Sequence, residues 1–315
     1  MKLKNMMDVN NMENKNINLF TERNQRLDSI GSVLSHVYEK IDSRTPVNEV
    51  TNLILSKKDV LEKSTNLELD YTLAESLAYQ TREMIDNQGN IKKRNSGRLY
   101  ASHPIYVGAI ANHLANYCNA SPKITKRATR FGLLHDIIEE GERITNPEKI
   151  TKEINCDIQT ARKIELLDMP NVSHNYEGEL PDKLKGHVAW AYLLSKQKDS
   201  SVHFSVMGDR IDCLSDLDYL FKKSKEQIPK RLAASLSAYR FMVEKLSESS
   251  DLVRPSLDVY NALEEIVKND SRLREHQDKY IPQLNKNLEN MRKDFEVQAH
   301  YFDKELKDVV DKYGE

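Results

Sequence analysis

The sequence predicts an all-α protein, and three observations lead to this prediction. Glycine and proline, which all-β folds need for their many turns, number only 10 and 9 in 315 residues. Apolar residues recur at helical spacing along most of the chain. Pairs such as Ser121-Pro122 and Asn146-Pro147 are typical of helix N-termini, because proline is tolerated at the first helical position. Together these features favour packed helices over strands.

The overall composition argues against several classes of function. With 47 Lys and Arg against 49 Asp and Glu, the formal net charge is −2, which gives no strong signal for nucleic-acid binding. No stretch approaches the roughly 18 apolar residues that cross a bilayer, and the polar N-terminus lacks the apolar segment of a secretory signal. Three cysteines without a CxxC pair favour a reducing compartment. We therefore expect a cytoplasmic protein with no membrane partner.

The N-terminal part is predicted to be a flexible leader over residues 1–18, followed by a helical extension over 19–69. The leader is rich in asparagine and shows no apolar period. The extension contains one amphipathic helix over 22–41 and a second over 47–61, which begins after a Thr-Pro pair. Neither helix carries a chemical motif.

Residues 70–222 are predicted to form the central domain. Two segments that lack helical periodicity, 87–98 and 169–181, are expected to be loops, and the second lies where loops often line sites. Between them a short helix is expected to start at Asn146. The longer helices are predicted over 70–84, 103–117, 121–139, 157–167, 182–196 and 201–220.

Residues 223–315 are predicted to form a C-terminal helical region. Helices are expected over 228–246 and 254–267, followed by a long amphipathic run that starts at Ile281. The first apolar steps of this run alternate between three and four residues, the spacing of a coiled coil, until Gln298 interrupts it. Two interpretations follow: a long helix folded back on the body of the protein, or a helix through which the chain forms a homodimer.

The residues with chemical character concentrate in the segment 100–140. His135 and Asp136 are adjacent and follow an apolar helical stretch. Glu139 and Glu140 lie three and four residues after Asp136, and on a helix these positions share its face. A His-Asp pair beside two carboxylates suits a metal ion and its activated water.

Two more residues complete a set of metal ligands. His103 stands at the expected start of a helix, and Asp209 lies on a largely apolar helix where a carboxylate is costly unless it is paired or ligating. Two imidazoles and two carboxylates can hold one divalent ion and leave positions open for water and phosphate.

In this order the residues resemble the H…HD…D signature of the HD-domain metal-dependent phosphohydrolases. Finer features resemble one branch, the (p)ppGpp hydrolase domain of RelA/SpoT-type proteins. Residues 94–100 match its R-x-S-G-x-x-Y loop, which is followed by His103-Pro104, and residues 135–140 follow its HDxxED motif. Residues 209–213 are similar to its DR-L-x-N helix. The resemblance covers about half of the chain and implies an HD-domain helical bundle, with the N-terminal helices and the C-terminal amphipathic helix as additions.

The resemblance also implies roles for individual residues. It assigns one metal ion, typically Mn²⁺, to His103, His135, Asp136 and Asp209. It assigns the positioning and deprotonation of the attacking water to Glu139 and Glu140. Arg94 matches the arginine that packs against the guanine base. Further substrate-pocket positions are Asn95, Ser96, Tyr100 and Cys213.

Three of these positions depart from the branch pattern. Glu140 stands in place of an aspartate, Cys213 in place of an asparagine that helps to hold the nucleotide, and Asn95 where a lysine is common. The synthetase domain of the longer relatives has no counterpart in this sequence. The resemblance therefore supports the metal site more strongly than the identity of the substrate.

The resulting prediction is metal-dependent hydrolysis of a nucleotide phosphate ester, with ppGpp converted to GDP and pyrophosphate as the favoured reaction. One alternative is a phosphohydrolase or phosphodiesterase that acts on another nucleotide. A second is a catalytically weak protein that senses nucleotides. A further alternative concerns the metal: His174 and His187 could hold a second ion, as in some HD phosphodiesterases.

Overall fold

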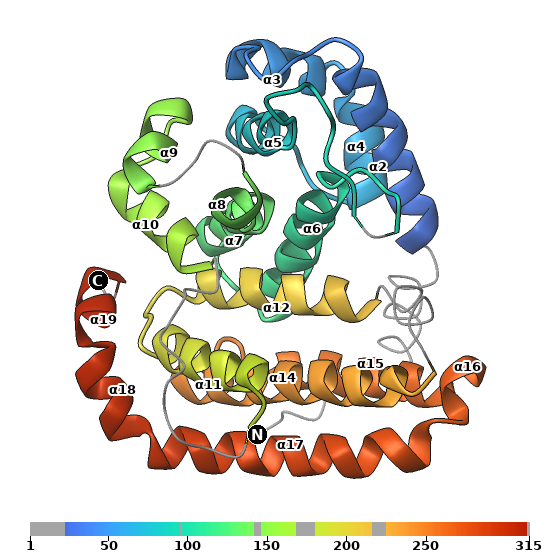
Figure 1. Cartoon of the computed structure of the whole chain (residues 1–315). Helices are drawn as coiled ribbons and strands as arrows, with labels where there is room; N and C mark the ends of the chain where they lie inside the picture. The colour runs from blue at the N-terminus through green and yellow to red at the C-terminus, as the bar shows by residue number, and fades with distance from the viewer. Residues whose placement is uncertain (1–22, 95, 142–145, 168–179, 216–224, 314–315) are drawn as a thin grey trace, which may run out of the picture.

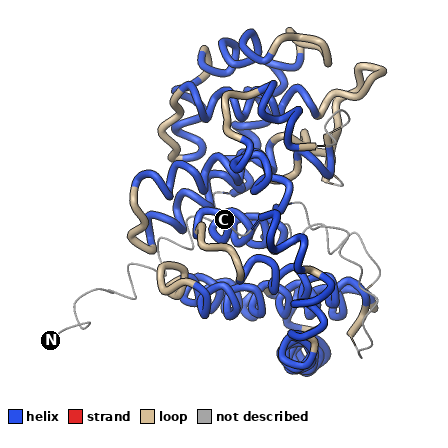
Figure 2. Tube along the Cα trace, turned by 90° about the vertical axis from the view of Figure 1, so that its left-hand side faces the viewer, coloured by secondary structure: helices blue, strands red, loops and turns tan. Residues whose placement is uncertain are grey.

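The structure is a computed structural model, and it describes residues 23–94, 96–141, 146–167, 180–215 and 225–313. Every regular element in these ranges is a helix, which confirms the predicted all-α class (Figures 1 and 2). The leader predicted over residues 1–18 lies outside the described residues. None of the described helices is both long enough and apolar enough to cross a membrane.

The N-terminal extension forms three helices, α2 (Arg23–Tyr38), α3 (Val47–Leu55) and α4 (Lys58–Thr65). The apolar face predicted for the first of them is buried. The single helix expected over 47–61 is two helices, because Lys57 leaves the helical conformation with φ −116° and ψ 14°. α3 packs on α5 (Tyr71–Glu83), whereas α2 packs on α4 and α6.

Three helices form the centre of the molecule: α6 (Ser102–Tyr117), α7 (Pro122–Leu134) and α12 (Ser200–Ser215) (Figure 1). The helix expected over 121–139 ends before His135, and the short α8 (Ile137–Glu140) follows it. Asp136 causes the break, since its φ of −92° and ψ of 4° lie in the sparsely allowed bridge region between helix and strand. The interruption falls at the expected metal ligands.

Glycines bring the three central helices unusually close together. A Cβ atom on Gly132 of α7 would lie 2.8 Å from the backbone of Gly108 on α6. A Cβ atom on Gly208 of α12 would lie 2.9 Å from the carbonyl oxygen of Val107. Both contacts involve backbone, which cannot move aside as a flexible side chain can. The backbones of these helices therefore approach one another more closely than they could if larger residues stood at the two glycine positions.

The C-terminal half adds a second layer against α12 (Figure 1). α14 packs on α12, α11 and α17, and one continuous apolar core extends from α2 to the C-terminal helices. The elements not yet described are α9 (Pro147–Glu153), α10 (Ile158–Leu167), α11 (Asp182–Ser195), α14 (Gln227–Ser249), α15 (Ser256–Asn269), α16 (Ser271–Arg274), α17 (Gln277–Val297), α18 (Ala299–Glu305) and α19 (Lys307–Tyr313).

The C-terminal amphipathic run is not one long helix. It breaks at Gln298, as the interrupted apolar spacing suggested, and again at Leu306. Leu284, Leu288 and Met291 on α17 are buried within the same chain, where α17 lies along α14. α18 and α19 then turn back towards the body (Figure 1), and Lys312 pairs with Glu165 of α10 at 2.8 Å.

Candidate metal centre

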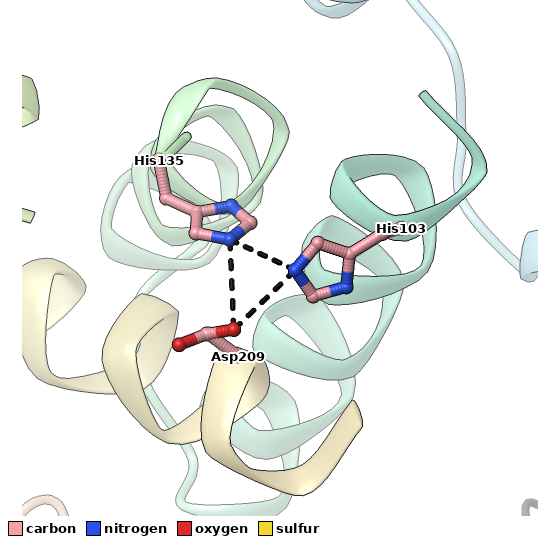
Figure 3. A group of neighbouring side chains, drawn as sticks. All are labelled: His103, His135 and Asp209. Carbon is pink, nitrogen blue, oxygen red and sulfur yellow. Dashed lines mark hydrogen bonds and ion pairs between the residues drawn. The ribbon is translucent and has the colours of Figure 1, made fainter. Parts of the chain in front are cut away.

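The structure brings together His103 of α6, His135, which directly follows α7, and Asp209 of α12 (Figure 3). The Nε2 atoms of the two histidines lie 3.2 Å apart. The Oδ1 atom of Asp209 lies 3.4 Å from Nε2 of His103 and 3.6 Å from Nε2 of His135. All three side chains are buried. This group could hold a metal ion, since its three ligand atoms all lie within 4.8 Å of one another.

Asp136, the fourth expected ligand, joins the same cluster. Its Oδ1 atom lies 2.9 Å from Nε2 of His135, and its Oδ2 atom lies 3.4 Å from Nε2 of His103. The break between α7 and α8 places this carboxylate there, because a continued helix would turn residue 136 about 100° away from residue 135. The cluster thus holds two imidazoles and two carboxylates.

The hydrogen bonds on the far side of each imidazole decide whether a cation fits. Nδ1 of His135 donates to the carbonyl oxygen of Gly132 at 2.9 Å, and Nδ1 of His103 donates to Oδ2 of Asp212 at 2.6 Å. Both acceptors lack a hydrogen, so each Nδ1 carries the proton. The Nε2 atoms then face each other and two carboxylates, an arrangement of donors that a divalent cation fits.

The opposite charges in the cluster raise the pKa of an imidazole and lower that of a carboxylate, so they favour the charged form of both groups. Burial by itself lowers the pKa of His135, but the Asp136 and Asp209 carboxylates outweigh it and raise that pKa well above its ordinary value. Burial raises the pKa of Asp136, but His135 and His103 outweigh it and lower that pKa to about 2. In the absence of metal the cluster therefore retains a proton on an imidazole, and metal binding would displace it.

Asp212 is a residue of this site that the sequence analysis missed. Its carboxylate is fully buried and accepts hydrogen bonds from His103, from Arg23 of α2 at 3.0 and 2.5 Å, and from Arg94 at 2.8 Å. Its position could have been predicted, because it lies three residues after Asp209 on the same helix and shares its face. Arg23 carried no such signal, since only the packing of α2 brings it to the site.

Tyr100 contacts the cluster through a ligand. Its hydroxyl donates to Oδ2 of Asp136 at 2.7 Å, and its ring stands edge-on to that of His103 with the centroids 6.1 Å apart. Burial and the Asp136 carboxylate raise the pKa of Tyr100, so the hydroxyl stays a donor at neutral pH. The sequence assigned this residue to the substrate pocket, whereas the contact seen here is with the carboxylate of Asp136, an expected metal ligand.

The two expected catalytic carboxylates lie in different surroundings. Glu139 lies on α8 with much of the residue in solvent, but desolvation of its carboxyl group and the negative charge of Asp136 and Asp209 raise its pKa. Glu140 forms an ion pair with Lys92, which also donates to the Glu140 carbonyl oxygen at 3.3 Å. The site thus increases the basicity of the Glu139 carboxylate, whereas the Glu140 carboxylate is engaged in an ion pair.

A cavity of about 690 Å³ lies beside the cluster, and several cationic side chains line it. Arg210 lines it and pairs with Asp209, and Cys213 lines it and donates to Oδ1 of Asp209 at 3.3 Å. The opposite wall comes from α11, with Lys183, and from α14, with Arg231. The C-terminal region, for which the sequence indicated no chemistry, therefore helps to enclose the site.

The remaining substrate positions are spread over the rim. Arg94 lines the cavity, but its Nη1 atom is engaged with Asp212. Ser96 is half-buried in the loop between α5 and α6, where Gly97 adopts a φ of +86°. Asn95 lies outside the described residues. For the second metal, His187 is buried on α11 and lines the cavity, whereas His174 lies outside the described part of the chain.

Comparisons with known proteins add no family to this description. No family model matches the chain, and neither a curated protein nor a solved structure matches it. The functional argument therefore depends on the site itself.

Proposed function

We propose that this protein is a metal-dependent phosphohydrolase that cleaves a nucleotide phosphate ester, with ppGpp as the favoured substrate and GDP and pyrophosphate as products. The proposal rests on one observation: a buried His/Asp cluster lies beside a cavity that is lined by cationic side chains. Neutral imidazoles and carboxylates suit a divalent ion, and cations beside it suit a phosphorylated substrate. The order of the motifs in the sequence points to the same reaction.

The metal would be held by His103, His135, Asp136 and Asp209, and Mn²⁺ accepts this combination of nitrogen and oxygen donors. When bound, such an ion supplies positive charge for the phosphate oxygens and lowers the pKa of water at the site.

The protein's own groups supply the other requirements of hydrolysis. Glu139, with its raised pKa, accepts the proton of the attacking water. Arg210 lies between Asp209 and the cavity, where its guanidinium offers hydrogen bonds to a phosphate group. Lys183 and Arg231 offer positive charge on the opposite wall, which suits a substrate that carries phosphate at both ends.

One observation favours a second candidate function, nucleotide sensing with weak catalysis. Glu140 is held by Lys92, and Arg94 is held by Asp212, so two residues that hydrolysis would use are engaged within the protein. A ligand that binds the cavity without being cleaved would compete for these pairs. Tight binding of ppGpp without turnover would distinguish this function from hydrolysis.

The proposal places the protein in the cytoplasm, since Cys118, Cys156 and Cys213 are all free thiols. It also allows a homodimer through the C-terminal helices. Because the apolar positions of α17 are buried within the chain, such a dimer would use the outward side of the helix, where Val297 is exposed.

The decisive experiment incubates the Mn²⁺-loaded protein with ppGpp and measures GDP and pyrophosphate by ion-exchange chromatography. We expect turnover that stops when a chelator removes the metal and that is absent in His135→Ala. A panel of other nucleotides and phosphodiesters, tested in parallel, identifies the substrate if ppGpp is not cleaved. Absence of hydrolysis across the whole panel, in protein that holds its metal, would reject the enzymatic proposal.

A further inference from the structure

The carboxylate of Asp212 is the most completely enclosed acidic group at the site. It has no exposed surface, and three cationic or proton-donating side chains surround it. Oδ1 accepts from both Nε and Nη2 of Arg23, whereas Oδ2 accepts from His103 and Arg94. Neither oxygen faces the expected metal position, so the residue is not itself a ligand.

We propose that Asp212 is a positioning residue, which fixes the tautomer and the orientation of the His103 ring for metal binding, and that Arg23 makes this function depend on helix α2. The inference rests on the metal centre of the proposed function but is independent of the substrate. A carboxylate that holds the distal nitrogen of a ligand histidine also increases the basicity of the nitrogen that binds the metal.

The two oxygens of Asp212 have different roles: Oδ2 holds the His103 ring, and Oδ1 is held by Arg23. The 2.6 Å contact with Nδ1 of His103 directs Nε2 of that ring towards His135 and Asp209. The Arg23 guanidinium, bound through two nitrogens, prevents the carboxylate from rotating away from the ring. Loss of either contact would leave the His103 ring free to adopt other orientations.

Arg23 connects this function to the N-terminal extension. It is the first residue of α2, and its guanidinium lies over the ring of Tyr106 at 5.6 Å. Tyr106 belongs to α6, the helix that carries His103. The extension is therefore attached to the ligand-bearing helix through the same arginine that holds Asp212.

The two ligand histidines differ in how they are held. His135 uses the backbone carbonyl of Gly132, which no side-chain substitution removes. His103 depends on a side chain 109 positions away in the sequence, which in turn depends on an arginine 189 positions from it. The proposal thus predicts that metal binding is sensitive to substitution at Asp212 and Arg23.

The test measures Mn²⁺ affinity by titration calorimetry of the full chain, with folding checked by thermal melting. We expect Asp212→Asn to weaken Mn²⁺ binding roughly 10–100-fold, the range found when such outer partners are removed. Arg23→Met, which keeps the carboxylate, should give a smaller loss in the same direction. If Asp212→Asn does not fold, the Mn²⁺ affinity of Arg23→Met tests the proposal instead, and an unchanged affinity in that variant would overturn it.

The chain offers a matched control in Asp199→Asn. This side chain is largely buried and pairs with Arg127 at 2.6 Å and Lys163 at 3.0 Å, so it resembles Asp212 in burial and in its two cations. It precedes α12 and contacts none of the metal ligands. We expect it to lower the melting temperature without changing the Mn²⁺ affinity.

A second readout separates positioning from general stability. Nitrogen-15 NMR of the metal-free protein, with the His103 signal assigned through His103→Gln, reports which ring nitrogen carries the proton. The wild type should show the Nδ1–H form, and Asp212→Asn should show a mixture. Unchanged affinity or an unchanged tautomer in folded Asp212→Asn would overturn the proposal. A wild type that binds Mn²⁺ but cleaves no substrate would reject only the proposed function.

Discussion

The inner and outer parts of the site are built in different ways. The inner part, the His/Asp cluster, is buried and held between helices that touch through glycine backbone. The outer part, the cavity, is lined by longer charged side chains from the loop between α5 and α6 and from α8, α11, α12 and α14. Lys92 of this loop, which pairs with the cavity residue Glu140, keeps 40% of its side chain exposed, whereas His103 keeps 4%.

This difference separates the requirements of metal binding from those of substrate binding. Ligand atoms must meet within a few tenths of an ångström, which close-packed helices and buried hydrogen bonds provide. A cavity wall of long cationic side chains can adjust to the shape of its ligand at little cost. Substitutions in the inner part should therefore act on metal affinity, and those in the outer part on substrate affinity alone.

The largest effect is expected from Asp209→Ala. This change removes a metal ligand and also leaves the guanidinium of Arg210 without its carboxylate. The Mn²⁺ affinity should fall by more than the roughly 100-fold that the loss of an outer partner costs, and hydrolysis should stop. Asp303→Ala, which removes an exposed carboxylate on α18, is the control for titration calorimetry. Tight Mn²⁺ binding by Asp209→Ala would remove this residue from the metal centre.

Gly132→Ala tests the close approach of α6 and α7. The new methyl group would meet backbone atoms of Gly108 at 2.8 Å, and we expect a loss of about 1–3 kcal/mol in the free energy of unfolding. Mn²⁺ affinity should fall as well, because α6 carries His103 and His135 directly follows the end of α7.

The matched control is Gly31→Ala on α2, where a Cβ atom has no neighbour within 4 Å. Removing a helical glycine there should stabilise the protein by about 0.5–1 kcal/mol and leave the metal affinity unchanged. Urea unfolding measures both variants. If Gly132→Ala were as stable as the wild type, the glycine contact would not hold the helices together.

The pH dependence of Mn²⁺ binding follows from the raised pKa of His135 in the metal-free cluster. Because the metal must displace a proton, affinity should increase as pH rises above the ordinary histidine value and level off only at the higher pKa. The expected change is about tenfold per pH unit while one proton is displaced. Titrations in a pH series, with proton release measured from buffers of different ionisation enthalpy, check this. A flat profile between about pH 6 and 8 would contradict it.

The smallest effects are expected at the outer wall. Lys183→Gln and Arg231→Gln each remove one positive charge from the cavity. Lys183 is exposed and Arg231 half-buried, and for such charges worth about 0.5–1 kcal/mol KM should rise roughly 2–5-fold, with salt reducing the difference. The Mn²⁺ affinity should stay constant, as in the control Arg272→Gln on α16. Unchanged KM in both variants would place the substrate elsewhere.

The same division explains what the sequence could predict. The order and spacing of His103, His135, Asp136 and Asp209 were sufficient to propose a shared metal centre, because each lies on or beside an amphipathic helix of the central domain. The break at Asp136 was not predicted, since Phe131–Glu139 reads as continuous helix and only the tertiary contacts favour the bridge conformation.

The partners from outside the central domain could not be predicted. Arg23 reaches Asp212 across 189 positions, and Arg231 faces the cavity from a helix in which the sequence shows only apolar spacing. Such contacts depend on how α2 and α14 dock, which helical periodicity does not specify. Asp212 differs from them because it lies within the central domain, where its position three residues after Asp209 would have been enough to place it on the same helix face.

The most direct test of the central claim is anomalous X-ray diffraction from crystals of the protein loaded with Mn²⁺. We predict one strong anomalous peak per chain, bound by Nε2 of His103, Nε2 of His135 and carboxylate oxygens of Asp136 and Asp209, with Asp212 on the far side of the His103 ring. A peak located elsewhere, or no peak in crystals that contain Mn²⁺, would contradict the metal centre and the phosphohydrolase proposal built on it.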